Sequence, residues 1–176
     1  MPNWCECDLY VTGNKWDISV FKSHAMNGKS PLSQKNFLPY PEHFQRLDDT
    51  ARYTNHIRYR LPRAFRINLP CQRDGYNNGG YWWCLKNWGT KWGICESCLN
   101  EHWVSSRSQH AELMYEFATA WSPPKKIINA MSQKFPTLAF TLKYFERGCE
   151  FNGRYEVENG VVLDDRCADY FGNRGG

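Results

Sequence analysis

Alternating apolar and polar side chains near the start of the chain predict a half-buried strand over 5–12. The apolar positions are Cys5, Cys7, Leu9 and Val11, and a period of two is that of a strand with one face buried. After Gly13, Asn14 with Asp17 three residues later resembles a capping box. A helix over 14–26 is therefore predicted, ending at Asn27-Gly28. Its helically spaced side chains are Trp16, Val20, Phe21 and His24.

The same alternation returns in the second half of the chain. It predicts strands over 113–121 and 138–145. A strand is also expected over 91–103, and Asn159-Gly160 predicts a hairpin of 151–157 with 161–163. Ser122 and Pro123 fit an N-cap and a first-turn proline, so a second helix is predicted over 123–134.

The order of these elements predicts a single α+β domain over residues 1–176, with the ferredoxin-like split βαβ arrangement. The sheet is expected to be antiparallel, with two helices on one face and a C-terminal β-hairpin. An insertion over 28–80 follows the first helix. Five prolines predict short helices or irregular structure there, and glycines and asparagines between 74 and 80 predict a flexible loop. The prolines are Pro31, Pro39, Pro41, Pro62 and Pro70.

Composition fits a folded protein that does not cross a membrane. Apolar residues make up 41% and aromatic residues 16%, which is enough for a substantial core. No apolar run approaches the roughly 18 residues that span a bilayer. The first residues have neither the basic nor the apolar region of a signal peptide. A cytoplasmic location is therefore expected, where eight cysteines act as thiols or metal ligands rather than disulfides.

Charge is distributed unevenly along the chain. Six arginines and no acid lie between Ala51 and Arg73, whereas seven acids and three arginines lie between Glu146 and Asp169. A basic segment of this kind meets phosphate or an acidic protein surface.

Six short motifs, in this order, resemble the YubB-type family of phage- and plasmid-borne proteins. They are Met1-Pro2-Asn3-Trp4-Cys5, Leu9-x-Val11-x-Gly13, Asn87-Trp88-Gly89-Thr90-Lys91-Trp92, Thr119-Ala120-Trp121-Ser122-Pro123-Pro124, Phe135-Pro136 and Tyr144-x-Glu146-x-Gly148-x-x-Phe151-x-Gly153. The resemblance covers 1–26 and about 81–160. It implies a ferredoxin-like fold and an origin on a mobile element of a bacterial host, and it implies no established activity.

A zinc site can be drawn from Cys84, Cys95, Cys98 and His102. Cys95-x-x-Cys98-x-x-x-His102 has ligand-like spacing. However, Cys84 stands well before the others, and neighbours three apart on an ordinary strand point to opposite faces. Buried free thiols are the preferred interpretation, and a reactive thiol is the remaining one.

Two further groups are candidate binding residues. Trp88 and Trp92 flank Lys91, so the indoles are suited to stacking on a base while the lysine meets phosphate. The alternative is a corner that locks a loop onto the sheet. The basic segment can track a nucleic-acid backbone or contact an acidic host protein, and its alternative is a solvated surface. Its candidate residues are Arg52, Arg58, Arg60, Arg63 and Arg66.

No glycine-rich phosphate loop, serine elbow or zinc-hydrolase motif is present, so no catalytic residue is assigned. The leading hypothesis is a non-enzymatic mobile-element protein that binds a host protein or complex, such as a defence or nucleic-acid machine. One alternative is a nucleic-acid-binding domain that uses the arginines and the tryptophans. Another is a sponge that holds a small signalling nucleotide in an aromatic pocket.

Overall fold

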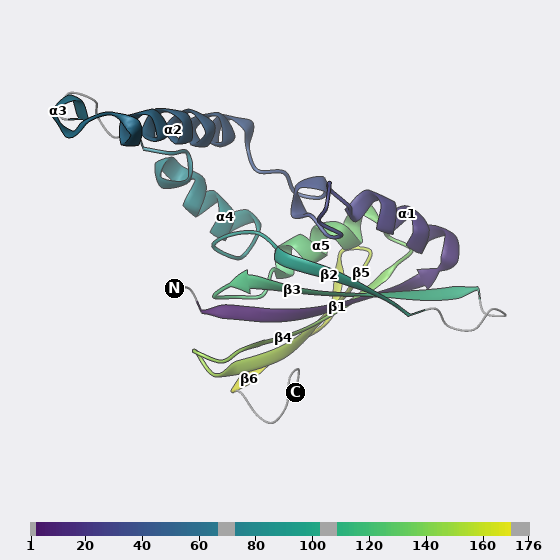
Figure 1. Ribbon diagram of the computed structural model, residues 1–176. Coiled ribbons are helices and arrows are strands. Elements are labelled where there is room, and N and C mark those ends of the chain that lie inside the picture. Colours follow the sequence, from purple (N-terminus) through teal and green to yellow (C-terminus); the bar gives the residue numbers. More distant parts are fainter. Residues whose placement is uncertain (1–2, 67–72, 103–108, 170–176) are drawn as a thin grey trace. The chain divides into compact units, whose positions relative to one another are not determined.

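The computed structural model describes residues 3–66, 73–102 and 109–169 (Figure 1). It divides into two compact units. The first, here called the sheet unit, comprises Met1–Pro39 and Leu85–Gly176, and the second, the helical unit, comprises Tyr40–Cys84.

The sheet unit has the ferredoxin-like fold that the sequence predicts. Its six strands lie in the order β2-β3-β1-β4-β5-β6, and every neighbouring pair is antiparallel. Helices α1 and α5 cover one face of this sheet, and among the described residues of the sheet unit no helix lies on the other face (Figure 1). The elements are β1 (Trp4–Asn14), α1 (Lys15–Ala25), η1 (Gln34–Asn36), β2 (Cys95–His102), β3 (His110–Ala120), α5 (Lys125–Lys134), β4 (Ala139–Glu146), β5 (Phe151–Glu158) and β6 (Val161–Asp169).

The core lies between the sheet and these two helices. On β1 the predicted apolar face is fully buried, and β3 and β4 bury their own alternate positions against it. Asn14 caps α1 as predicted, because its side chain accepts a hydrogen bond from the backbone N–H of Asp17 at 3.0 Å. The buried face of α1 is Ile18, Phe21 and Ala25, whereas Trp16 is 76% exposed.

The second predicted helix begins later than expected. The prediction placed Ser122 at the N-cap, but α5 starts at Lys125 and Pro124 takes the N-cap position. The Ser122 hydroxyl donates instead to the carbonyl of Gly89 at 2.7 Å. Ser122 therefore links the loop before α5 to the loop that contains Gly89, and its hydroxyl is not available to cap the helix.

The strand predicted over 91–103 is shorter, because β2 begins at Cys95. A bulge interrupts its pairing with β3 between Cys95 and Cys98, and Glu96 has a positive φ of 50°. The C-terminal hairpin has the expected turn. Asn159 and Gly160 both have positive φ, as a two-residue hairpin loop requires.

The helical unit is more regular than the predicted insertion. Its main element is α2 (Glu42–Arg60), a helix of 19 residues, followed by α3 (Arg63–Arg66), the turn η2 (Tyr76–Gly80) and the start of α4 (Tyr81–Asn87). Within the segment predicted as a flexible loop, η2 is a kinked turn in which Asn78 and Gly79 leave helical φ/ψ. Gly75 and Gly80 are required there, since a Cβ at either would clash with Phe44 or Tyr40.

Among the residues that the structure describes, no helix has both the length and the apolar composition to cross a bilayer.

Candidate binding surfaces

The helical unit exposes an unusual number of large apolar side chains. Ala51 is the one buried residue of α2, so most of this long helix faces away from the unit's own core. Large apolar patches on a protein surface mark interaction sites. The exposed side chains are Tyr53, Ile57, Tyr59, Phe65 and Trp82.

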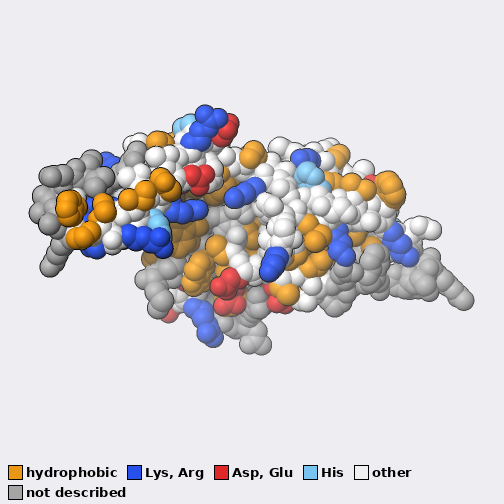
Figure 2. All heavy atoms as spheres, turned by 45° about the horizontal axis from the view of Figure 1, so that its top comes forward, with side chains coloured by type: hydrophobic (Ala, Val, Ile, Leu, Met, Phe, Trp, Pro, Cys, Tyr) orange, Lys and Arg blue, Asp and Glu red, His pale blue; other side chains and the backbone are white. Residues whose placement is uncertain are grey.

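The predicted arginines lie among these apolar residues, and Figure 2 shows blue and orange side chains interleaved over α2 and α3 at its left. Arg52 pairs with Asp49 at 3.9 Å on the surface. Arg58 is half-buried and Arg60 exposed, both in the last turn of α2. The side chain of Arg63 lies outside the described residues.

Arg66 contacts the backbone at the end of α2. Its guanidinium donates to the carbonyls of Leu61 and Tyr59, both at 2.7 Å. These carbonyls belong to the end of α2, where a helix leaves acceptors without intrahelical partners. Arg66 therefore caps the helix that carries the rest of the surface. We call Tyr53, Ile57, Arg58, Tyr59 and Arg60 the basic–aromatic surface.

A small polar and aromatic core positions α2 within its unit. The ring of Tyr40 stacks on Phe44 and meets Trp83 edge-on, with centroids 5.7 Å apart in both pairs. Asp48 accepts a hydrogen bond from the backbone N–H of Tyr76 at 2.9 Å. Burial raises the pKa of the Cys84 thiol to about 11, and the nearby Asp48 carboxylate adds to this.

In the sheet unit, the Trp88–Trp92 motif forms a loop packed against its neighbours. Trp88 is only 6% exposed, and its indole N–H donates to the carbonyl of Leu38 at 2.8 Å. The hydroxyl of Thr90 is buried and donates to the carbonyl of Ala120 at 2.8 Å. Base stacking on Trp88 would require this packing to open.

Trp92 and Lys91 lie nearer the surface. The Lys91 ammonium sits over the Trp92 ring, 5.0 Å from its centre. The same ring lies 6.2 Å from that of Trp4, the first residue of β1. Two of the sequence motifs, far apart in the chain, thus meet at one end of the sheet.

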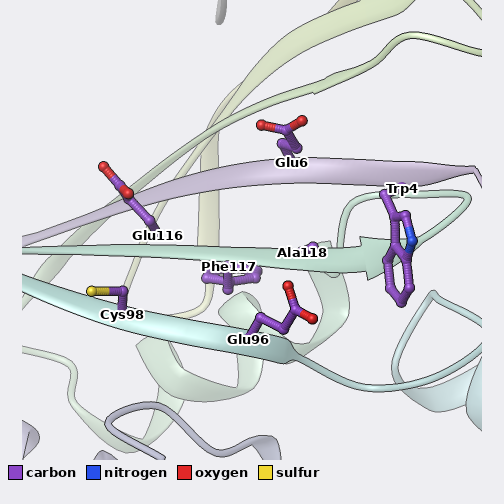
Figure 3. Close-up of a pocket in the computed structure, with 7 residues that line it drawn as sticks. All are labelled: Trp4, Glu6, Glu96, Cys98, Glu116, Phe117 and Ala118. Atoms are coloured by element: carbon purple, nitrogen blue, oxygen red, sulfur yellow. The ribbon is translucent and has the colours of Figure 1, made fainter.

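A pocket of about 370 Å³ opens beside Trp4 on the helix-free face of the sheet (Figure 3). Its described lining holds three carboxylates and no basic side chain. The sequence alone does not predict this pocket. Its three carboxylates occupy ordinary polar positions of three strands, and the order of those strands in the sheet cannot be read from the pattern. The lining residues are Trp4, Glu6, Glu96, Cys98, Glu116, Phe117 and Ala118.

The helix-free face offers few rings for stacking. The ring of Tyr10 is covered by the ammonium of Lys143 at 5.8 Å, and Phe145 is only 7% exposed. Carboxylates of Glu6 and Glu116 lie on the same face. Around the pocket, these carboxylates repel a phosphate backbone.

The predicted zinc ligands do not form a described cluster. Cys95 is partly buried and Cys98 exposed on β2, while Cys84 belongs to the helical unit. The side chain of His102 lies outside the described residues. Within the described ranges, no group of three metal-ligating side chains comes together.

The motif that begins at Tyr144 and ends at Gly153 has a structural role at the turn between β4 and β5. Glu146 is 1% exposed, and its carboxylate accepts hydrogen bonds from the backbone N–H groups of Gly148 and Cys149. Tyr144 lies across Gly153, where a Cβ would come within 2.4 Å of the phenol oxygen. These residues therefore stabilise the sheet.

The sheet with two helices on one face and the family model that matches part of the sequence both define a ferredoxin-like domain. Residues 100–172 match the family model of the ferredoxin-like domain in Api92-like proteins. Among solved structures the chain is similar to the protein Api92 from Yersinia pseudotuberculosis. The TM-score is 0.52 at 11% identity, over 98% of this chain and 99% of that one. No curated protein sequence matches.

Proposed function

We propose that this chain is a non-enzymatic binding protein whose basic–aromatic surface on α2 contacts an acidic surface of a partner protein. The observation that carries this is a 19-residue helix with one buried residue and with tyrosine and arginine on its exposed sides. Tyrosine, tryptophan and arginine dominate the energetics of protein interfaces. Exposed Ile57 adds an apolar side chain, which can pack against a protein surface but makes no favourable contact with a phosphate backbone.

The partner in this proposal is a host protein or complex. The mobile-element origin rests on the YubB-type resemblance alone, since the matching family model is that of Api92-like proteins. A chain encoded on such an element acts inside its host, and inhibition of a defence or nucleic-acid machine by contact is the form of action that we propose.

Nucleic-acid binding is the second candidate, and Arg58 and Arg60 are the residues that favour it. It has less support, because Trp88 is buried and the pocket on the helix-free face of the sheet is acidic. A nucleotide sponge has less still. Its site needs arginines beside aromatic rings. The lining of the pocket beside Trp4 has no arginine, and the lining of a second pocket, around Arg154 and Arg166 on β5 and β6, has no aromatic ring.

The test is affinity capture from a nuclease-treated lysate of the bacterial host. Tyr53→Ser/Tyr59→Ser removes the two exposed phenols, and Trp16→Ser is the matched control because Trp16 is an equally exposed ring on α1. We expect a defined protein to be retained by the native chain and the control but lost by the double variant. Equal retention by all three chains would contradict a protein partner at this surface. Capture that succeeds only from a lysate without nuclease treatment would contradict it as well.

A further inference from the structure

Strand β6 forms one edge of the six-stranded sheet. In the described part of the chain, no strand pairs with its outer side. All its residues except Asp164 are exposed, and three consecutive aliphatic side chains stand at its start. Their exposed fractions are 60% for Val161, 47% for Val162 and 57% for Leu163. An exposed edge with apolar side chains is a template for pairing with another strand.

The backbone of β6 determines which residues can pair outward. The Arg166 carbonyl faces β5, because the Tyr144 hydroxyl donates to it at 3.2 Å and a Cβ on Gly153 would lie 2.3 Å from it. In an antiparallel strand the N–H and C=O of one residue point to the same side, and the next residue points to the other. Asp165 therefore directs its backbone groups outward.

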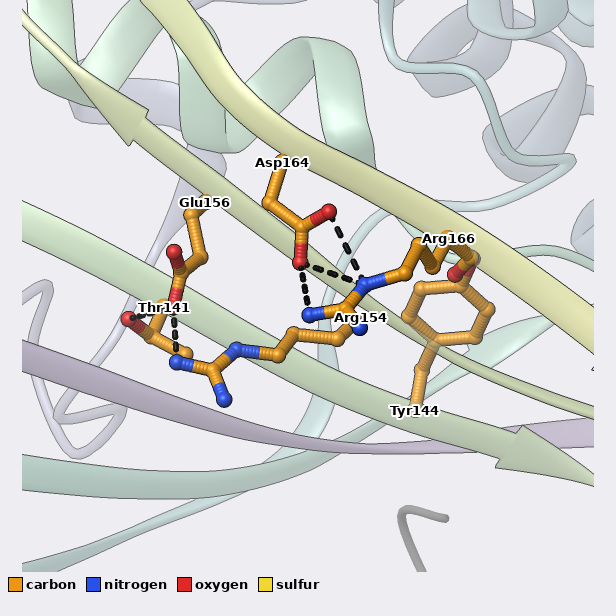
Figure 4. Close-up of polar contacts among 6 residues, drawn as sticks. All are labelled: Thr141, Tyr144, Arg154, Glu156, Asp164 and Arg166. Atoms are coloured by element: carbon orange, nitrogen blue, oxygen red, sulfur yellow. Dashed lines mark hydrogen bonds and ion pairs between the residues drawn. The ribbon is translucent and has the colours of Figure 1, made fainter.

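Side-chain charge then selects one register. Asp164 and Arg166 lie on the helix-free face, and the guanidinium of Arg166 contacts the Asp164 carboxylate at 2.7 Å within the strand (Figure 4). If β6 meets a second β6 antiparallel with Asp165 on the two-fold axis, Asp164 of each copy faces Arg166 of the other. These two pairs fall at positions without backbone hydrogen bonds, where side chains lie closest.

We propose that β6 pairs with β6 of a second copy of this chain, antiparallel and centred on Asp165, to form a two-fold symmetric dimer with a continuous sheet. Such an interface is isologous, so one self-complementary strand is sufficient. Asp165 faces its counterpart on the axis, and in each copy Lys125 of α5 lies 2.5 Å from that carboxylate and offsets the repulsion.

The bulge in β6 limits the extent of this pairing. Asp164 is opposite Glu156 and Val162 is opposite Val157, so Leu163 is an extra residue in the ladder. Regular pairing covers about 163–167, and the exposed aliphatic residues flank it. The interface is consequently small, and the dimer is a weak one that forms at high protein concentration.

Charge reversal tests the register through its symmetry. In Asp164→Arg the two facing pairs become arginine against arginine, and in Arg166→Asp they become aspartate against aspartate. Each variant should weaken association about tenfold in sedimentation velocity experiments. An equimolar mixture of the two variants restores both opposite-charge pairs, so a heterodimer should return. Arg46→Asp makes the same charge change on α2, outside the interface, and should associate as the native chain does.

Disulfide formation between two copies tests the same register independently. Asp165→Cys in a Cys98→Ser/Cys149→Ser/Cys167→Ser background places thiols of two copies opposite each other, within reach of a disulfide. Val161→Cys in that background has no facing cysteine. Rapid oxidation to a dimer by the first variant alone supports the proposal. A native chain that stays monomeric at high concentration, or a mixture of the charge variants that forms no heterodimer, would overturn it.

Discussion

Glu146 illustrates what a single residue contributes to this fold. It is a buried charge at the end of β4, and it accepts two backbone N–H groups of the following turn. Removal of the carboxylate takes away the acceptor of both N–H groups, which lie in an exposed turn where water can replace it in part. Glu146→Ala should therefore lower the free energy of unfolding by roughly 2 kcal/mol, measured by urea denaturation. Glu158→Ala, an exposed change at the end of β5, should alter it by less than about 0.5 kcal/mol. Equal effects of the two changes would show that the turn does not depend on Glu146.

The cysteines differ in reactivity because they differ in burial. Cys7 and Cys84 are buried, and burial raises the pKa of both thiols. Since the thiolate is the reactive form, a raised pKa leaves less of it near neutral pH. Alkylation of the folded protein should modify Cys98 and Cys167 first, both of which are exposed.

The labelling of Cys84 should rise about tenfold for each unit of pH up to its pKa of about 11. Mass spectrometry of peptides after timed alkylation gives the rate for each site. Labelling of Cys84 as fast as that of Cys98, in a chain whose circular dichroism is unchanged, would contradict this order.

At the scale of elements, the arginines of the basic segment divide into two roles. Arg66 donates to two carbonyls at the end of α2, whereas Arg60 is exposed. Arg66→Ala should destabilise the helical unit by about 1 kcal/mol, seen as earlier loss of helical circular dichroism on heating. Arg60→Ala should leave that transition in place. The reverse ranking would show that Arg66 does not cap α2.

Alternation was enough to predict the central strands β1, β3 and β4, because each buries one face on the side of the sheet that α1 and α5 cover. The same reasoning missed α2. The prolines were interpreted as interrupting the whole insertion, but Pro41 and Pro62 flank a stretch of 20 residues without proline or glycine, of which α2 takes up 19. Bracketing prolines of this kind are a signal of helix boundaries.

Candidate sites were harder to predict than elements, because a site depends on which residues become neighbours. The arginines were identified from charge alone, yet the helix cap by Arg66 depends on a chain reversal after α2 that composition does not encode. Likewise, Glu6, Glu96 and Glu116 come from three strands, and strand order brings them into one pocket.

For the whole molecule, the division into two units separates stability from recognition. The sheet unit holds the larger core and most of the sequence motifs. The helical unit carries the basic–aromatic surface with little core of its own. Substitutions at this surface should therefore change binding without changing the stability of the sheet, and Arg58→Glu/Arg60→Glu is the pair that tests this by charge.

Photo-crosslinking is the measurement that tests the proposed surface most directly. A benzophenone side chain at Tyr53 or Tyr59, irradiated in a nuclease-treated host lysate, should yield a protein adduct. The same group at Trp16 should yield none, and Arg58→Glu/Arg60→Glu should abolish the adduct at Tyr53. Higher ionic strength should weaken the Tyr53 adduct of the chain that keeps both arginines. An adduct from Trp16 but not from Tyr53 or Tyr59, or an adduct that survives the charge reversal, would contradict the account.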